Sequence, residues 1–212
     1  VGAFRYTLGQ QSVQYGHDIM VKPDGKIVVL GKSWTGGSSY DSLVLVLNPD
    51  GTHDFDFVGS GSGWVLEDFG NNERFTSGVI QPDGKIIASG WAGPYDNNAD
   101  FLVVRYNADG SRDSTFGTAG VFTLDIGTFD RGWDIALQPD GKLLLFGWGT
   151  SFNTLIRLNS NGTLDSTFGN NGIGGTADGG GRGVVLQADG RIIVVGNTDA
   201  TETRISRFEG NN

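Results

Sequence analysis

A short motif that occurs four times along the chain constrains the fold most strongly. Each copy has Asp-Gly, then a basic residue, then a mainly apolar run that ends at Gly, and the copies lie at 22–31, 81–90, 138–147 and 187–196. Their Asp residues, at 24, 83, 140 and 189, are 59, 57 and 49 residues apart. Self-similarity at such a spacing is typical of chains built from repeated supersecondary units. The sequence therefore predicts four similar units.

Each motif predicts a β-hairpin, because Pro and Asp favour a tight turn and Gly accepts a positive φ. The apolar runs, such as 27–30, 43–47, 101–106 and 192–195, suit strands and are too short for helices. A second turn follows the first three motifs at 48–52, 107–111 and 159–163, and its fourth copy is reduced to 209–212. Glycines seven apart, at 2/9, 63/70, 120/127 and 172/179, bracket one more strand per unit.

Each unit thus has four antiparallel strands: A before the first turn, B after it, C before the second turn, and D between the paired glycines. Four such strands are the content of a propeller blade. The chain begins with a D strand and ends at 204–208 with a C strand, so the N-terminal strand can complete the last blade and remove a free edge. We predict an all-β fold, a closed four-bladed β-propeller forming one domain over 1–212. The predicted blades are 16–70, 74–127, 131–179, and 182–208 with 1–9. The alternatives are part of a larger ring, or an open unit that lends its first strand to a neighbour.

The motif residues resemble a known family of repeats. Gln81-Pro-Asp-Gly-Lys-Ile86, the segment 102–117 ending in Arg-Asp-Ser-Thr-Phe-Gly, and Gly120-Val-Phe122 are similar to the delta-60 repeat family of bacterial β-propellers. The resemblance covers nearly the whole chain. It implies a propeller and an extracellular or cell-surface location in bacteria, and it brings no catalytic residue. Unit 1 departs from it with Asp54-Phe-Asp-Phe57, and unit 3 with Gly174-Gly175.

Composition narrows the classes of function. With 15 basic and 24 acidic residues the net charge is -9, which argues against nucleic acid and anionic lipid as partners. The longest apolar run, Leu43 to Leu47, is far too short for a membrane helix, so we expect no membrane insertion. The chain has no Cys, and its two histidines, His17 and His53, are expected on opposite faces. We therefore predict that it is not an enzyme; an enzymatic alternative would need Asp18 and Asp134 to face a central channel.

The predicted loops between strands B and C, at 31–42, 90–100, 147–153 and 196–203, carry side chains that a propeller does not need. Aromatic rings stack on sugars and carboxylates accept hydrogen bonds from their hydroxyls, but the same set also suits a protein interface. The predicted ligand-binding residues are Trp34, Tyr40, Asp41, Trp91, Tyr95, Asp96, Trp148, Phe152 and Asp199. For Trp34, Trp91 and Trp148, packing between blades is the alternative.

One loop suggests a cation. Asp96, Asn98 and Asp100 place oxygen ligands at alternate positions, as calcium prefers, although Phe101 and Asn107 replace the Gly and Glu of an EF-hand loop. Calcium is the one cofactor that the sequence suggests. A similar oxygen pattern at 107–113 is explained by Asx-turn bonding.

These observations together predict a non-enzymatic extracellular module that recognises a glycan or a surface protein through its aromatic, Asp- and Asn-rich loop face. The alternative is a structural building block of a bacterial adhesin or extracellular assembly, which self-associates by strand exchange. A carbohydrate-active enzyme is the weaker alternative.

Overall fold

The structure is a computed structural model that describes residues 13–34, 36, 39–59, 61–70, 72–94, 98–149, 152–176, 180–197 and 202–210. It is all-β, as predicted: its strands form four antiparallel sheets, each with its strands in chain order. The one helical element in the described part of the chain is a 3-10 turn, η1 (Phe57–Gly59). No helix among these residues is long and apolar enough to cross a bilayer.

The four sheets correspond to the four sequence repeats. Blade 1 contains β1 (Val13–Val21), β2 (Ile27–Trp34), β3 (Tyr40–Leu47) and β4 (Trp64–Glu67). Blade 2 contains β5 (Asn72–Ile80), β6 (Ile86–Gly93), β7 (Asp100–Tyr106) and β8 (Val121–Leu124). Blade 3 contains β9 (Arg131–Leu137), β10 (Leu143–Gly149), β11 (Phe152–Leu158) and β12 (Ile173–Thr176). Blade 4 contains β13 (Gly180–Leu186), β14 (Ile192–Asn197) and β15 (Thr203–Phe208).

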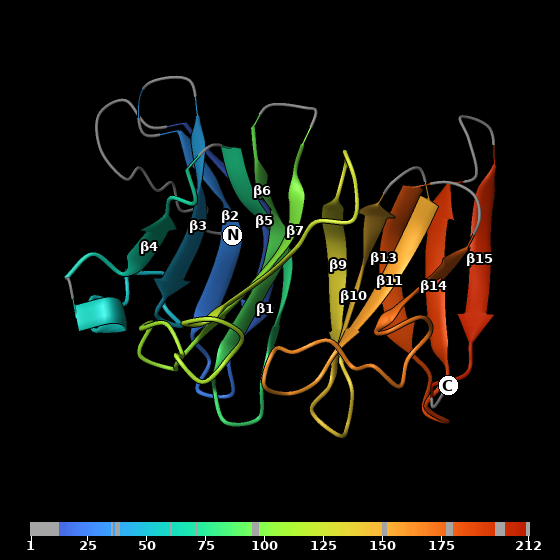
Figure 1. The fold of residues 1–212 in the computed structure, drawn as a ribbon. Coiled ribbons are helices and arrows are strands. Elements are labelled where there is room, and N and C mark those ends of the chain that lie inside the picture. The colour runs from blue at the N-terminus through green and yellow to red at the C-terminus, as the bar shows by residue number, and fades with distance from the viewer. Residues whose placement is uncertain are drawn as a thin grey trace.

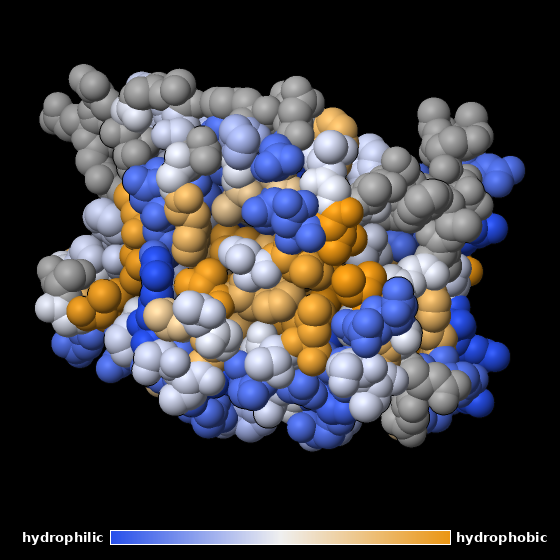
Figure 2. Space-filling view, viewed as in Figure 1, coloured by the Kyte–Doolittle hydropathy of each residue, from blue (hydrophilic) through white to orange (hydrophobic). Residues whose placement is uncertain are grey.

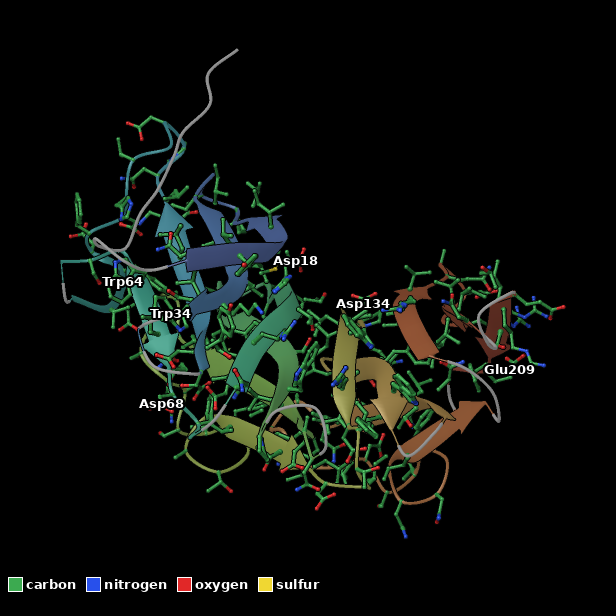
Figure 3. The ribbon with its side chains drawn as sticks, turned by 90° about the horizontal axis from the view of Figure 1, so that it is seen from above. Asp18, Trp34, Trp64, Asp68, Asp134 and Glu209 are labelled. Atoms are coloured by element: carbon green, nitrogen blue, oxygen red, sulfur yellow. The ribbon has the colours of Figure 1, made fainter. Side chains whose placement is uncertain are left out.

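The blades follow one another along an arc, which Figure 3 shows from above with blade 1 in blue and blade 4 in red. The first strand of every blade lies on the inner side, and the four inner strands β1, β5, β9 and β13 together line a cavity of about 540 Å³. Its wall is mainly apolar, with residues such as Met20, Val79, Leu137 and Leu186. This arrangement is that of a propeller.

Ring closure is not shown by the described residues. The predicted closing strand, residues 1–9, lies outside them, and in their part of the chain β15 forms one edge of a three-stranded sheet. Ile19 and Val21 of β1 are each 67% exposed, and Val185 of β13 is 60% exposed. These side chains therefore lie exposed on the faces of blades 1 and 4 at the two ends of the arc. Closure by the N-terminal strand stays a prediction.

The hairpins form for the reason that the motif predicts. In the first turn, the Asp24 carboxylate accepts a hydrogen bond from the Lys26 N–H at 3.1 Å, and Gly25 has a φ of 84°. The same bond recurs in the other three turns, from Lys85 to Asp83, from Lys142 to Asp140 and from Arg191 to Asp189. In Figure 1 these turns lie at the lower end of the molecule, and Figure 2 shows that end as largely polar below a hydrophobic middle.

The core lies between the blades. Three buried clusters each join two neighbouring sheets; in the first, Val28 and Leu30 of β2 pack with Ala88 and Val104 of blade 2. Phe57, Phe116 and Phe168, which occupy equivalent positions in blades 1, 2 and 3, belong to the three clusters in order, so each packs between two blades. Phe57 lies against Gly110 so closely that a Cβ there would be 2.8 Å from its ring.

A repeated arginine stabilises two of these junctions with polar bonds. Arg105 binds the Asp113 carboxylate at 2.8 Å within blade 2 and donates to the Ser160 carbonyl of blade 3 at 2.6 Å. Arg157 does the same one blade further on, with Asp165 at 2.7 Å and the Gly210 carbonyl at 2.7 Å. The repeated arginines are therefore blade-pairing residues.

Candidate functional site

The B strands extend further than the sequence predicts, so three candidate residues lie in strands and not in loops. Trp34, Trp91 and Trp148 were expected in loops, but they lie in β2, β6 and β10. The reason is that each of these strands continues past the motif glycine and pairs with the first residues of the inner strand. We call the end of the sheets that carries these positions the upper face, since it is uppermost in Figure 1.

An aromatic residue and a cation face each other at the same position of three consecutive blades. Immediately after each motif glycine, the strand pairing sets Lys32 opposite Tyr15, Trp91 opposite Arg74, and Trp148 opposite Arg131. Directly opposed side chains on neighbouring strands are close enough to interact. The fourth blade has Asn197 opposite Gly180 at this position.

In blade 1 the cation lies over two rings. The Lys32 ammonium is 3.8 Å from the centre of the Tyr40 ring and 4.9 Å from that of Tyr15, and the two rings meet edge to face at 6.1 Å. Tyr15 is 44% exposed, so part of this group faces solvent. Trp34 lies at the end of β2, directly opposite Tyr40, and is half-buried.

In blade 2 the tryptophan is a packing residue. Trp91 is only 5% exposed and meets Trp133 of β9 edge to face, with ring centres 5.0 Å apart. The Arg74 guanidinium lies 4.5 Å from the centre of the Trp91 ring, and that of Arg131 lies 5.5 Å from it. The predicted ligand residue Trp91 is therefore enclosed between blades 2 and 3, and its ring is not open for stacking.

In blade 3 the tryptophan is accessible. Trp148 is 37% exposed, and its ring stacks on Phe129 with an interplanar angle of 20° and centres 6.3 Å apart. The Arg131 guanidinium lies 5.9 Å from the centre of the Phe129 ring. The exposed Trp148 ring, stacked on the half-buried Phe129 beside a cation, offers both a stacking surface and a charged hydrogen-bond donor.

Positive charge gathers at the inner part of the upper face. The pKa of the His17 imidazole lies below its usual value because the ring is partly buried and because Arg74 and Lys32 are nearby. Burial and the charge of Arg74 also lower the pKa of Lys32. Arg182 of β13 adds a further cation, 4.8 Å from the centre of the Trp133 ring. Cationic side chains of blades 1, 2 and 4 thus lie at this part of the upper face, although the chain as a whole is acidic.

Acidic side chains gather at two blade junctions of the same face. Asp41, Asp68 and Glu73 form one triad, and Asp100, Asp125 and Asp130 form another; within each, one oxygen per residue lies within 4.8 Å of the others. The strand registers show that the triads occupy equivalent positions: Asp41 opposite Ser33 corresponds to Asp100 opposite Ala92. Burial, and the charge of Asp125, raise the pKa of Asp100.

The other predicted residues divide between these groups and the parts of the chain that are not described. Asp41 belongs to the first triad and Asp100 to the second, whereas Asn98 is exposed. Phe152 is the first residue of β11. Tyr95, Asp96 and Asp199 lie outside the described residues, so the predicted calcium set of Asp96, Asn98 and Asp100 is not described as a whole.

Sequence reasoning missed Arg74, Arg131, Asp68, Asp125 and Asp130. A signal for Asp68 and Asp125 was present, because both precede by two residues a glycine that ends a predicted D strand. The contribution of Asp130 could not be seen, because its approach to Asp100 depends on how blade 3 packs on blade 2.

The two carboxylates of the enzymatic alternative bridge inner strands. Asp18 accepts a hydrogen bond from the Gly78 N–H at 2.8 Å, and Asp134 accepts one from the Val184 N–H at 2.8 Å and one from the Ser77 hydroxyl at 2.8 Å. Figure 3 shows both aspartates on the inner side of the arc. They join neighbouring blades in this structure.

The oxygen pattern at 107–113 closes a turn. The Asp109 carboxylate accepts hydrogen bonds from the Ser111 N–H at 2.9 Å and from its hydroxyl at 2.7 Å, while the Asn107 amide donates to the same hydroxyl. This is the Asx-turn bonding expected from the sequence.

Comparisons with known proteins place the chain in a family. A solved structure of a protein described as a candidate gluconolactonase is similar, with a TM-score of 0.48 and 15% identity, over 93% of this chain. The chain spans 61% of that protein, and a likeness of this degree says nothing about chemistry. No curated protein matches the chain. The family model described as a domain of unknown function (DUF5122) beta-propeller matches residues 22–57, 81–116, 138–168 and 187–211, one stretch per blade. The chain belongs to this DUF5122 β-propeller family.

Proposed function

We propose that the chain is a non-enzymatic binding module whose upper face recognises an acidic glycan. The observation that carries this proposal is the recurrence of a cation opposite an aromatic ring at the same strand position in three consecutive blades. The rings of the first and third pairs, Tyr15 and Trp148, are partly exposed, whereas Trp91 of the second pair is buried. A polymeric ligand could therefore stack one sugar on the ring of blade 1 and another on the ring of blade 3.

The chemistry of the pairs fits a sugar that carries a carboxylate. A partly exposed ring, such as that of Trp148 or Tyr15, offers a flat apolar surface for the C–H face of a sugar. A guanidinium such as that of Arg131 can bind a carboxylate through two parallel hydrogen bonds. The positive charge around His17 would favour an anionic ligand over a neutral one.

An extracellular or cell-surface location in bacteria belongs to the same proposal. It is supported by the resemblance of the four units to delta-60 repeats. A glycan of a cell envelope or matrix would be within reach of such a module.

Binding of oligogalacturonate, compared with cellulose fragments of equal length, tests the proposal by isothermal titration calorimetry. We expect the wild-type chain to bind the acidic oligosaccharide, and Trp148→Ala and Arg131→Gln to weaken binding by roughly tenfold each, or about 1.4 kcal/mol. Phe55→Ala is the matched control, because Phe55 is also exposed, at 60%, but lies after the turn at the opposite end of the sheet. Equal binding of both oligosaccharides, or equal loss in all three variants, would contradict the proposal.

Assembly through the ends of the arc is the second candidate function. Ile19, Val21, Val185 and Ile205 are exposed by 60% or more, and an apolar cavity of about 370 Å³ lies on the face of blade 1 that points away from blade 2, between Ile19, Ile27, Leu45 and Pro49. Exposed apolar groups of this kind favour contact with another protein surface. Sedimentation velocity tests it: concentration-dependent association that disappears in Ile205→Asp would support assembly, and a wild-type chain that stays monomeric at high concentration would rule it out.

A further inference from the structure

The second acidic triad has one member that is fully buried. Asp130 has no exposed surface, and its Oδ2 accepts hydrogen bonds from the backbone N–H groups of Ile126 at 2.5 Å and Gly127 at 3.0 Å. Its Oδ1 is also buried but has no hydrogen-bond donor among the described residues. The same holds for Oδ1 of Asp100. A buried carboxylate oxygen without a partner is costly, so each of these oxygens calls for an explanation.

No positive side chain in the described part of the chain compensates the triad. The ion pairs there involve other carboxylates, such as Asp113 with Lys85 and Asp165 with Lys142, and none involves Asp100, Asp125 or Asp130. Three carboxylates with oxygens within 4.8 Å of one another repel each other strongly in a partly buried site. Accordingly, burial and the charges of Asp125 and Asp100 raise the pKa of Asp130, despite its two backbone donors.

The ligand set is that of a hard cation. Calcium takes oxygen ligands at 2.3–2.6 Å, so ligands on opposite sides of the ion are up to about 5 Å apart, and it accepts six to eight of them. The spacing of the triad is within that limit. Asp125 is exposed, so one side of the site is open to solvent and waters can complete the coordination shell.

We propose that Asp100, Asp125 and Asp130 bind a calcium ion that ties blade 2 to blade 3. Asp100 is the first residue of β7 and Asp125 directly follows β8, both in blade 2, whereas Asp130 directly precedes β9 of blade 3. The ion therefore bridges the two blades on the upper face. It stands apart from the glycan proposal, which rests on the aromatic and cationic pairs.

The fold holds these ligands in place. The Asp130 N–H donates to the Ala99 carbonyl at 2.8 Å, and Ala99 pairs with Phe129, so the segments before β7 and before β9 run side by side. The Asp125 carboxylate accepts a hydrogen bond from the Gly127 N–H at 3.0 Å. Gly149 lies against the site: a Cβ there would be 3.1 Å from Oδ1 of Asp130.

The other junctions provide an internal comparison. The equivalent triad between blades 1 and 2, Asp41, Asp68 and Glu73, has the same pattern of one buried, one half-buried and one exposed acid. Between blades 3 and 4 the position of Asp100 is occupied by Phe152, the residue opposite Gly149. A calcium bridge of this kind is therefore expected only at blade junctions that carry the acidic side chains.

Calorimetric titration of the metal-free chain with calcium, followed by thermal unfolding, tests the site. The variant Asp130→Asn keeps an oxygen that can accept the two backbone hydrogen bonds but removes the charge. We expect it to bind one calcium ion fewer per chain than the wild type. Asp140→Asn, at an exposed acid in a turn of the opposite end, serves as the matched control and should bind as the wild type does.

The thermal measurements separate a metal ligand from a merely structural residue. Without calcium, Asp130→Asn should unfold at the same temperature as the wild type or higher, because a buried, repelled charge has been removed. Calcium should raise the melting temperature of the wild type more than that of the variant. The proposal is overturned if both chains bind the same number of ions, or if magnesium raises the melting temperature of the wild type as much as calcium does.

Discussion

The Asp134 carboxylate of β9 accepts a hydrogen bond from the Val184 N–H of β13, so a single side chain joins the inner strands of blades 3 and 4. Its other oxygen accepts a hydrogen bond from the Ser77 hydroxyl of β5, which extends the link to blade 2. The equivalent residue of blade 4 is Gly183, which has no side chain and therefore cannot form such a hydrogen bond to a following blade. The inner strands are thus held together by specific polar bonds as well as by apolar packing.

Replacing this carboxylate should weaken the whole propeller. In Asp134→Ala the Val184 N–H and the Ser77 hydroxyl lose their acceptor, so we expect the free energy of unfolding to fall by about 1–3 kcal/mol. Urea denaturation followed by tryptophan fluorescence measures this change. Asp189→Ala, in an exposed turn, is the control and should cost less; an equal loss in both would contradict the role of Asp134 as a bridge.

Acid should destabilise the protein through Asp113 and Asp165. The Lys142 ammonium, and then the Thr167 hydrogen bonds and the Arg157 charge, lower the pKa of Asp165 despite its burial. Burial by itself would raise the pKa of Asp113, but bonds from Thr115 and Lys85 and the charge of Arg105 lower it overall.

The sign of the pH dependence follows from these directions. Because both folded-state pKa values lie below the usual 3.8, the two carboxylates stabilise the fold above that pH, and the contribution is lost as the pH falls below it. We expect the urea midpoint to fall steeply below about pH 4, and less steeply in Asp165→Asn. An Asp165→Asn midpoint that falls as steeply as that of the wild type would contradict this assignment.

Two turn glycines allow the energetic cost of a left-handed backbone to be distinguished from the cost of a steric clash. Gly162 has a φ of 82°, and a Cβ there would lie 2.7 Å from the Gly117 nitrogen and 2.9 Å from the Phe116 ring. Gly190 has a φ of 85° but nothing within 4 Å of a Cβ. We expect Gly190→Ala to cost about 1–2 kcal/mol, the cost of a left-handed conformation, and Gly162→Ala clearly more. Equal costs in denaturation experiments would mean that the contact of Phe116 with Gly162 is not tight.

Two tryptophans at equivalent positions should behave differently. Trp91→Ala removes a buried ring between blades 2 and 3 and should cost about 3–5 kcal/mol of stability. Trp148→Ala removes a ring that is 37% exposed and should cost much less. Thermal unfolding of both variants checks this order, and a reversed order would show that Trp148 is the packing residue.

Much of the fold could be predicted from the sequence, because turn chemistry and strand length are local properties. The glycine pairs correctly bracket β4, β8 and β12. The upper ends were less predictable: β1 begins at Val13 and β5 at Asn72, before the predicted 16 and 74. The strands continue there because Lys32 and Trp91 find partners on the inner strand, which is a matter of pairing.

The candidate site was predicted only in part. The aromatic and acidic composition of the upper face was visible, since Trp34, Tyr40, Asp41 and Trp148 are found there. The burial of Trp91 was not, because it depends on Trp133, a residue of the next blade. Contacts between units of a repeat cannot be derived from the pattern within one unit.

The contact of a Phe with a turn glycine of the next blade occurs at successive junctions, from Phe57 to Gly110 and from Phe116 to Gly162. Such a joint, a contact between two neighbouring blades, helps to set the angle between them. It does not determine how many blades the protein has. Tandem duplication of one unit would therefore create a new copy of an existing joint without disturbing the others. In this architecture, chain length can change by whole blades during evolution while local geometry stays constant.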